Sequence, residues 1–146
     1  MNWISNLVLK YFYIGNFQYA PGSLSSLFAA LVWFFIPDSM LFKLLFLLIH
    51  LLMGFYFCYL FYSTRPIDKD PSFIVIDEVV GMMISLYLAP KIFSAYLMAF
   101  ILFRFFDILK PSIIDRAQYV NYGIGIMLDD IISGFLSLLI VYGIFY

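Results

Sequence analysis

One stretch of the chain, residues 41–62, limits the possible folds more than any other feature of the sequence. It holds 22 residues and carries a single charged side chain, Lys43, near its start. A helix of that length is about 33 Å long, and the hydrocarbon core of a bilayer is about 30 Å thick. The stretch therefore predicts a helix that crosses a membrane.

Further apolar segments predict further membrane helices. Residues 73–89 and 92–109 are each just long enough to cross, and residues 124–146 are 23 residues interrupted by two aspartates. Residues 24–36 number only 13, so we expect this first helix to be short, tilted or re-entrant. Residues 3–14 are expected to form a helix at the membrane interface, where Trp and Tyr side chains are favoured.

The composition supports an all-α integral membrane protein with a single domain, residues 1–146. Hydrophobic residues make up 65% of the chain and charged residues 12%, against about 45–50% and 25% in soluble domains. The alternation typical of strands is absent, so we expect about five hydrophobic helices and an N-terminal interfacial helix. A net charge of −1 without a basic run excludes a nucleic-acid-binding protein. A single cysteine, Cys58, excludes an internal disulfide framework.

Basic residues are distributed unequally between the two sides of this predicted bundle. Short connections fall at residues 21–23, 37–39, 65–71, 89–91 and 111–123. If five helices cross, beginning at Leu24, five basic residues lie on one side and two on the other. The first side holds Lys10, Arg65, Lys69, Lys110 and Arg116, and the second holds Lys43 and Lys91. Because Lys and Arg favour the cytoplasmic side, the first side is predicted to face the cytoplasm.

Apart from Lys43, at the start of the stretch 41–62, the charged residues inside the predicted membrane helices fall near that same side. A charge at membrane depth costs about 2.5 kcal/mol or more, so such residues usually face a bundle interior or a watery cavity. They belong to three different helices: Asp77 and Glu78; Arg104 and Asp107, with Lys110 just beyond; and Asp129 and Asp130. This convergence predicts a polar site that opens to the cytoplasm.

Carboxylates placed this close together repel one another unless protons or a divalent metal lie among them. Oxygen-only ligands favour Mg²⁺, which is usually held by a few carboxylates, water and substrate phosphates. Arg104 and Lys110 are suitable partners for a phosphate. Gly81 and Gly134 each follow an aspartate by four residues and would let the acidic helices approach closely. Together these features favour phosphoryl chemistry on a lipid headgroup.

The same residues carry a family resemblance. The blocks APGS (20–23), IVIDEVVG (74–81), FRFFDILKP (103–111) and GIGIMLDD followed by SG (123–130 and 133–134) occur in this order over most of the chain. They resemble the signature blocks of the phosphatidylglycerophosphatase A family. The first block differs from the family pattern, since Gln18, Ser23 and Ser25 stand where that pattern has other residues, although Ser23 keeps a hydroxyl group.

The resemblance implies a Mg²⁺-dependent enzyme that removes the terminal phosphate of phosphatidylglycerophosphate and leaves phosphatidylglycerol. It implies a multi-pass protein of the bacterial cytoplasmic (inner) membrane with its active site facing the cytoplasm. Implied catalytic residues are Asp77, Glu78, Asp107 and Asp130, and implied metal ligands are Asp77, Glu78, Asp107, Asp129 and Asp130. Implied substrate-binding residues are Arg104, Lys110, Gly22 and Ser23.

Other interpretations of these residues stay open at this point. Arg104 and Asp107 are also suited to a structural ion pair at i,i+3 spacing, and buried acids also serve cation or proton transporters. Three other phosphatase designs are excluded. Cysteine phosphatases have five residues between the cysteine and the arginine, but six separate Cys58 from Arg65. Histidine-based lipid phosphatases need two histidines, but this chain has only His50. Phosphatases of the haloacid-dehalogenase type need an Asp-x-Asp-x-Thr or Asp-x-Asp-x-Val motif, and neither motif occurs.

Overall fold

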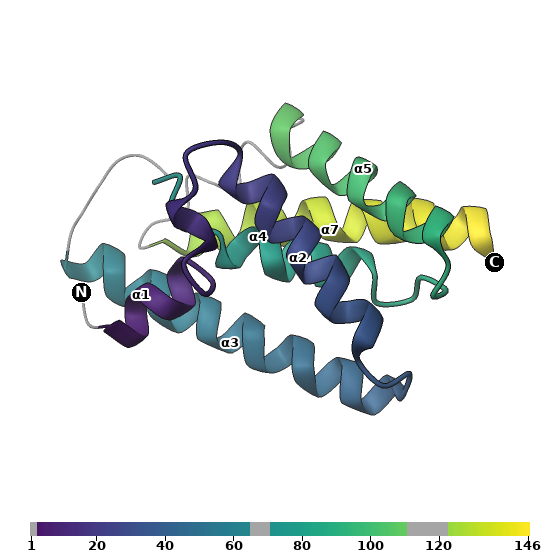
Figure 1. Cartoon of the computed structure of the whole chain (residues 1–146), viewed down its shortest axis with the longest axis horizontal. Coiled ribbons are helices and arrows are strands. Elements are labelled where there is room, and N and C mark those ends of the chain that lie inside the picture. The colour runs from purple at the N-terminus through teal and green to yellow at the C-terminus, as the bar shows by residue number, and fades with distance from the viewer. Residues whose placement is uncertain (1–2, 65–70, 111–122) are drawn as a thin grey trace.

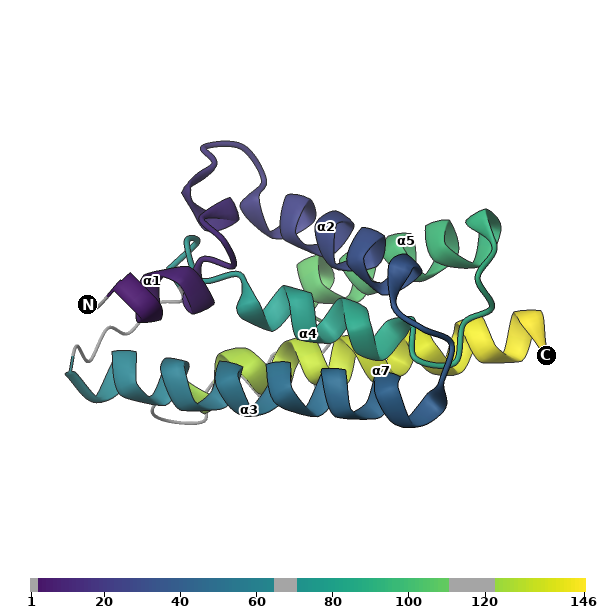
Figure 2. The same ribbon diagram turned by 60° about the horizontal axis from the view of Figure 1, so that its bottom comes forward.

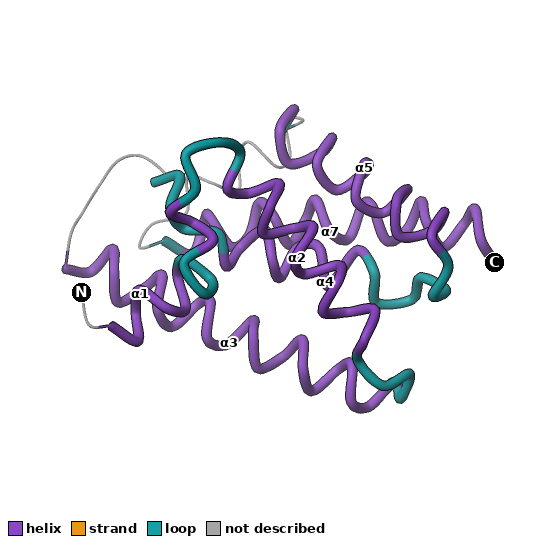
Figure 3. Tube along the Cα trace, in the orientation of Figure 1, coloured by secondary structure: helices purple, strands orange, loops and turns teal. Residues whose placement is uncertain are grey.

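The computed structural model describes residues 3–64, 71–110 and 123–146. Every regular element in these ranges is helical (Figure 3), as the sequence predicts. The expected connections at 65–71 and 111–123 lie, except for Pro71 and Gly123, outside the described residues. The elements are α1 (Trp3–Leu9), the 3₁₀ turn η1 (Ile14–Asn16), α2 (Pro21–Phe35), α3 (Met40–Thr64), α4 (Ile76–Ser85), α5 (Phe93–Leu109) and α7 (Ile124–Phe145).

Helix α4 lies at the centre of the bundle. It contacts α2, α3, α5 and α7, and Figure 2 shows it between α2 and α5 on one side and α3 and α7 on the other. Nine of its ten residues are buried, and the tenth, Glu78, is partly buried. The other helices therefore shield α4 from the surroundings of the protein.

The long helices alternate in direction. In Figure 1, α2, α4 and α7 begin at the end of the bundle where α3 and α5 finish. The first turns of α2, α4 and α7 therefore share one end of the molecule with the last turns of α5. That end contains Asp77, Glu78, Arg104, Asp107, Asp129 and Asp130, whereas Lys43, in the first turn of α3, lies at the other end.

Within the described residues, two helices are long and apolar enough to cross a membrane. They are α3, with 25 residues, and α7, with 22, and they agree with the predicted stretches 41–62 and 124–146. In the most apolar window of α3 only 17% of the residues are buried, against 50% in α7. Helix α3 thus presents most of its apolar surface outward, as a lipid-facing helix does.

The expected crossing at residues 73–89 differs from the observed helix. Helix α4 has ten residues and a length of about 15 Å, half the thickness of the hydrocarbon core. Before it, the amide of Val75 donates to the carbonyl of Leu9 at 2.8 Å, which fixes the chain in a non-helical conformation. After it, the amide of Ala89 donates to the carbonyl of Leu86 at 3.1 Å in a turn. These tertiary and turn contacts leave α4 as a short core helix.

The predicted turn at residues 21–23 is instead the first turn of α2. The chain turns one residue earlier, at Ala20, whose φ of 46° is left-handed. Pro21 then occupies the first helical position, where its fixed φ favours a helix and its missing amide hydrogen costs nothing. Helix α2 still has only 15 residues, and α5, predicted at 92–109, has 17.

The N-terminal helix is shorter than the sequence predicts. Helix α1 ends at Leu9, and Tyr11, Phe12 and Tyr13 all have positive φ values, so residues 3–14 do not form one helix. The Tyr11 hydroxyl lies 3.3 Å from Nε2 of His50, which ties this segment to α3. Burial raises the pKa of Tyr11 to about 12. Trp3 keeps 68% of its surface exposed, as an interfacial side chain would.

Candidate active site

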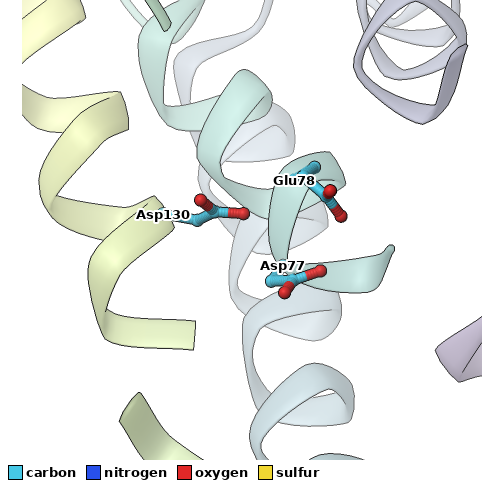
Figure 4. A group of neighbouring side chains, drawn as sticks. All are labelled: Asp77, Glu78 and Asp130. Carbon is cyan, nitrogen blue, oxygen red and sulfur yellow. The ribbon is translucent and has the colours of Figure 1, made fainter. Parts of the chain in front are cut away.

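Three carboxylates from two helices meet at the shared end of the bundle. Asp77 and Glu78 lie in the first turn of α4, and Asp130 lies in the second turn of α7. One oxygen of each lies within 4.8 Å of the others. Figure 4 shows Asp130 projecting from α7 towards α4, which carries the other two. Asp77 and Asp130 each expose only 3% of their surface, so this acidic cluster (Asp77, Glu78 and Asp130) is largely shielded from water.

Two glycines bring these helices together. A Cβ atom added to Gly134 would lie 2.4 Å from the carbonyl oxygen of Gly81, and one added to Gly81 would lie 2.7 Å from the carbonyl oxygen of Asp130. Both distances are far below van der Waals contact. The close approach of α4 and α7 therefore requires glycine at both positions, which confirms the expectation drawn from their spacing.

Arg104 borders the acidic cluster from α5. Its Nη1 atom lies 2.6 Å from Oδ2 of Asp107 and 3.9 Å from Oε1 of Glu78. The side chains of these three residues are 13–17% exposed. The guanidinium group thus forms the expected ion pair along α5 and also faces the cluster, while its role as a phosphate partner stays a prediction.

The first turn of α2 closes over this pair. A Cβ atom at Gly22 would lie 2.1 Å from Oε1 of Glu78 and 3.2 Å from Nη1 of Arg104. A side chain here would displace the Glu78 carboxylate from its present position, so glycine lets the start of α2 lie against this carboxylate. Ser23 follows Gly22 in the same turn and is partly buried. The hydroxyls of Ser25, which the sequence marks only as a departure from the family pattern, and of Ser26, which sequence reasoning overlooked, both donate to the Gly22 carbonyl, at 2.7 and 2.8 Å. Their spacing from Gly22, three and four residues, is the signal for such bonds.

Lys110 and Asp129 form a second pair beside the cluster. Nζ of Lys110 lies 2.5 Å from Oδ2 of Asp129, whose side chain is 3% exposed. Burial by itself lowers the pKa of Lys110, but the hydrogen bond and charge of Asp129 outweigh it and raise the pKa above its ordinary value. Lys110 reaches this position because it ends α5 in a left-handed conformation, with a φ of 40°.

The structure therefore divides the five predicted carboxylates into two groups. Asp77, Glu78 and Asp130 face one another, whereas Asp107 and Asp129 are each paired with a cation, and the side chain of Asp107 also forms a hydrogen bond with that of Asp130. If every group is ionised, five negative charges face two positive ones. Such an excess at low solvent exposure requires protons or a metal cation for compensation.

The donor set of the acidic cluster fits a divalent cation. Opposite ligands of Mg²⁺, at about 2.1 Å from the ion, are about 4.2 Å apart, and those of Ca²⁺ are about 4.8 Å apart. The oxygens of the cluster lie within 4.8 Å of one another, and all are carboxylate oxygens, the donors that hard cations prefer. A small inward movement of the side chains would suit Mg²⁺.

The fold and site together define a class: a helical protein with membrane-length helices and a shielded carboxylate centre beside a guanidinium group. Comparison with known proteins assigns the family. The family model for phosphatidylglycerophosphatase A matches residues 7–145. The chain therefore belongs to the phosphatidylglycerophosphatase A family and is a lipid phosphatase.

Three curated relatives cover most of the chain. Proteins named phosphatidylglycerophosphatase A from Haemophilus influenzae and Escherichia coli are 34% and 36% identical to it over 131 and 129 residues. These matches cover 87% and 84% of this chain, and 80% and 72% of the relatives. A Bacteroides thetaiotaomicron protein named "Putative phosphatidylinositol-3-phosphatase" is 31% identical over 137 residues, covering 87% of this chain and 84% of that protein. No solved structure matches the chain.

Proposed function

We propose that this lipid phosphatase hydrolyses the terminal phosphate of phosphatidylglycerophosphate, producing phosphatidylglycerol and inorganic phosphate for phospholipid biosynthesis. The observation that carries the proposal is the acidic cluster, whose carboxylates lie within 4.8 Å of one another while Nη1 of Arg104 lies 3.9 Å from Glu78. A site of this kind offers anionic ligands for a metal and a cationic fork for a phosphate. The names of the Haemophilus and Escherichia relatives support the same substrate.

Mg²⁺ is the proposed cofactor. Asp77, Glu78 and Asp130 are the proposed direct ligands because their oxygens already converge. Asp107 and Asp129, which were also expected to be ligands, are proposed to orient Arg104 and Lys110 through their ion pairs. When bound, Mg²⁺ would neutralise phosphate charge and lower the pKa of a coordinated water molecule.

The cationic residues are proposed to hold the phosphate. Arg104 presents two nitrogens in a fixed plane and so suits two non-bridging phosphate oxygens, whereas Lys110 acts as a point charge. Gly22 and Ser23 would contribute backbone and hydroxyl groups at the start of α2, where helix amides favour anions. Charge stabilisation by this arrangement is the main proposed source of catalysis.

A water molecule is the proposed nucleophile, with a carboxylate of the acidic cluster accepting its proton. The oxygen–phosphorus bond to water forms as the bond to the lipid oxygen breaks, and the proton taken from water is passed to that lipid oxygen, so that phosphatidylglycerol leaves as an alcohol. Single-turnover hydrolysis in ¹⁸O-water should place the label in inorganic phosphate. Since water that opens a phospho-aspartyl intermediate at phosphorus would label the phosphate as well, a trapped phospho-aspartyl species is the result that would contradict direct water attack.

The decisive assay measures phosphate release by the purified full chain in detergent micelles. Phosphatidylglycerophosphate should be hydrolysed with Mg²⁺ present, and excess EDTA should abolish the reaction until Mg²⁺ is restored. Asp130→Asn should remove activity, whereas Asp38→Asn should keep it, because Asp38 is an exposed carboxylate paired with Lys43 beyond the other end of α2. Full activity in EDTA would contradict the metal requirement.

Phosphatidylinositol 3-phosphate is the second candidate substrate, because of the name of the Bacteroides relative. Both lipids carry a terminal phosphomonoester, so the acidic cluster and Arg104 would treat their reacting groups alike. The two lipids are therefore compared at equal concentration in the same micelles. A kcat/KM at least tenfold higher for phosphatidylinositol 3-phosphate would reverse the substrate assignment.

The proposed location is the bacterial cytoplasmic membrane, with the site facing the cytoplasm. Gly22 at the start of α2 contacts the site, whereas Lys91 reaches the Ile36 carbonyl at the far end of this helix, at 2.5 Å. Single cysteines at Gln18 and Ser39, both exposed, mark these two ends in a Cys58→Ala background. In intact cells an impermeant thiol reagent should label position 39 and spare position 18. The opposite pattern would reverse the orientation.

A further inference from the structure

A long apolar groove separates α2 from α5 on the outside of the bundle. Its volume is about 910 Å³, and side chains such as Leu24, Leu31 and Phe34 on α2 and Leu97 and Phe100 on α5 line it. Among the described residues that line the groove, only Lys91 is charged; it lies at the end remote from the acidic cluster, and its amine already donates to the Ile36 carbonyl. The groove therefore suits an uncharged, elongated hydrocarbon.

The groove begins where the active site ends. Leu24 follows Gly22 by two residues, and Gly22 contacts Glu78. On the facing helix, Phe100 precedes Arg104 by four residues, which is about one helical turn. The two helices that border the groove thus also carry the Gly22 backbone and the guanidinium group at the acidic cluster. A single elongated molecule can occupy both places.

The length of the groove matches one leaflet of a bilayer. From Leu24 to Phe34 the helix rises by about 15 Å, which is half of the roughly 30 Å hydrocarbon core. Its volume of about 910 Å³ is within the range of about 300–1,000 Å³ found for small-molecule sites. These dimensions fit acyl-chain methylene groups that run from the membrane surface towards the bilayer midplane.

We propose that this groove holds an acyl chain of the phosphomonoester lipid substrate while the phosphate lies at the acidic cluster. The inference rests on the proposed function for its headgroup end. Membrane lipids without a terminal phosphomonoester have acyl chains of the same chemistry, but they offer no phosphate that could bind Arg104 at the mouth of the groove. The groove therefore aligns the substrate, and the headgroup selects it from the bulk lipid.

The first test combines substrates of two acyl-chain lengths with variants that change the shape of the groove. Leu97→Trp fills the groove, and Ile101→Trp is its matched control, because both residues are on α5 and about half exposed while only Leu97 lines the groove. The substrates are dioleoyl and dihexanoyl phosphatidylglycerophosphate. Leu97→Trp should lower kcat/KM for the dioleoyl lipid about tenfold. This is the loss expected if roughly two methylene groups of the acyl chain can no longer be buried in the groove. Leu97→Trp should leave the dihexanoyl lipid within twofold of wild type, since the short chain ends before Leu97.

The possible outcomes distinguish a failure of the groove proposal from a failure of the proposed function. If wild type hydrolyses neither lipid with Mg²⁺, the proposed function fails. If wild type hydrolyses both, but Leu97→Trp and Ile101→Trp show the same ratio between the two lipids, the groove proposal fails. Activity on the dihexanoyl lipid reports that a variant is folded. Should Leu97→Trp lose that activity too, Leu31→Trp on the opposite wall provides the same comparison.

A second measurement uses the wild-type protein and needs no variant. A non-hydrolysable phosphonate analogue of the lipid carries a photoreactive group in its acyl chain, and a phosphocholine lipid with the same chain is the control. Cross-links should concentrate on α2 and α5 at Leu31 and Leu97 with the phosphonate, and competition by phosphatidylglycerophosphate should remove them. Equal labelling of these positions by both lipids would overturn the proposal.

Discussion

Replacing Gly134 by Ala should separate the two acidic helices. The added Cβ atom would lie 2.4 Å from the Gly81 carbonyl oxygen and 3.1 Å from Cβ of Ile84. Normal contact begins near 3.4 Å, so α4 and α7 must move apart by about 1 Å. Rotation of a side chain cannot relieve the contact, because the nearest atom belongs to the backbone. Overpacking of this kind costs about 1–3 kcal/mol.

The expected loss of stability is smaller than that cost. Alanine gains up to about 1 kcal/mol over glycine in a helix interior, so the free energy of unfolding should fall by up to about 2 kcal/mol. For a chain of this length that corresponds to a decrease of several degrees in Tm. The loss of activity should be larger, because a misplacement of 1 Å at a catalytic site can lower the rate about 100-fold.

The assay combines phosphate release with thermal unfolding in the same detergent, and Gly143→Ala is the control. Gly143 is on the same helix, and a Cβ atom there would meet nothing within 4 Å. This variant should keep wild-type activity with an unchanged or slightly higher Tm. If Gly134→Ala instead matches Gly143→Ala in both activity and Tm, the close contact with Gly81 does not position the acidic cluster.

Three further predictions concern the charged residues. Arg104→Lys should lower kcat/KM at least tenfold without a loss of Tm comparable to that of Gly134→Ala, because the charge remains while the two-nitrogen fork is lost; an unchanged kcat/KM would remove Arg104 from the phosphate site. Lys110→Met should lower the free energy of unfolding by about 3 kcal/mol, because the buried Asp129 carboxylate then lacks its cation. In a double-mutant cycle, Asp129→Asn added to Lys110→Met should restore part of this stability. The hydrogen bond from Lys43 lowers the pKa of Asp38 below its ordinary value of 3.8, so the small stability advantage of wild type over Asp38→Asn should be present above pH 4 and disappear as the pH falls through that lowered pKa; a constant difference down to pH 2 would contradict this.

The location of the site could be predicted from the sequence, because it depends on local rules. Residues such as Asp77, Arg104 and Asp130 fall near the ends of apolar segments, and short connections force successive helices to alternate in direction. Side chains at matching ends must then meet at one end of the bundle. Likewise, Gly81 and Gly134 follow their aspartates by one helical turn, so their role in close packing could be predicted from spacing alone.

The length of α4 could not be predicted in this way. Hydropathy reports that a segment avoids water, but protein and lipid provide equally apolar surroundings. The residues of α4 are apolar because other helices surround them. The start of α4 is set by a distant group, the Leu9 carbonyl, which accepts a hydrogen bond from the Val75 amide. The pairing of Lys110 with Asp129 is also non-local, since it depends on the left-handed conformation that ends α5. The groove between α2 and α5 is a space between helices, which no sequence pattern records.

The short central helix explains how an acidic site can exist in so apolar a chain. A carboxylate exposed to lipid would be costly, but Asp77 and Glu78 lie in the first turn of α4, where the helix dipole favours negative charge. Because α4 spans only about half the hydrocarbon core, the longer helices can surround its first turn and shield the carboxylates from lipid. Glycine contacts bring Asp130 to the same place, and Arg104 and Lys110 supply positive charge beside it. On this argument, lengthening α4 at its first turn would harm activity more than lengthening it at its last, since only the first turn carries the carboxylates.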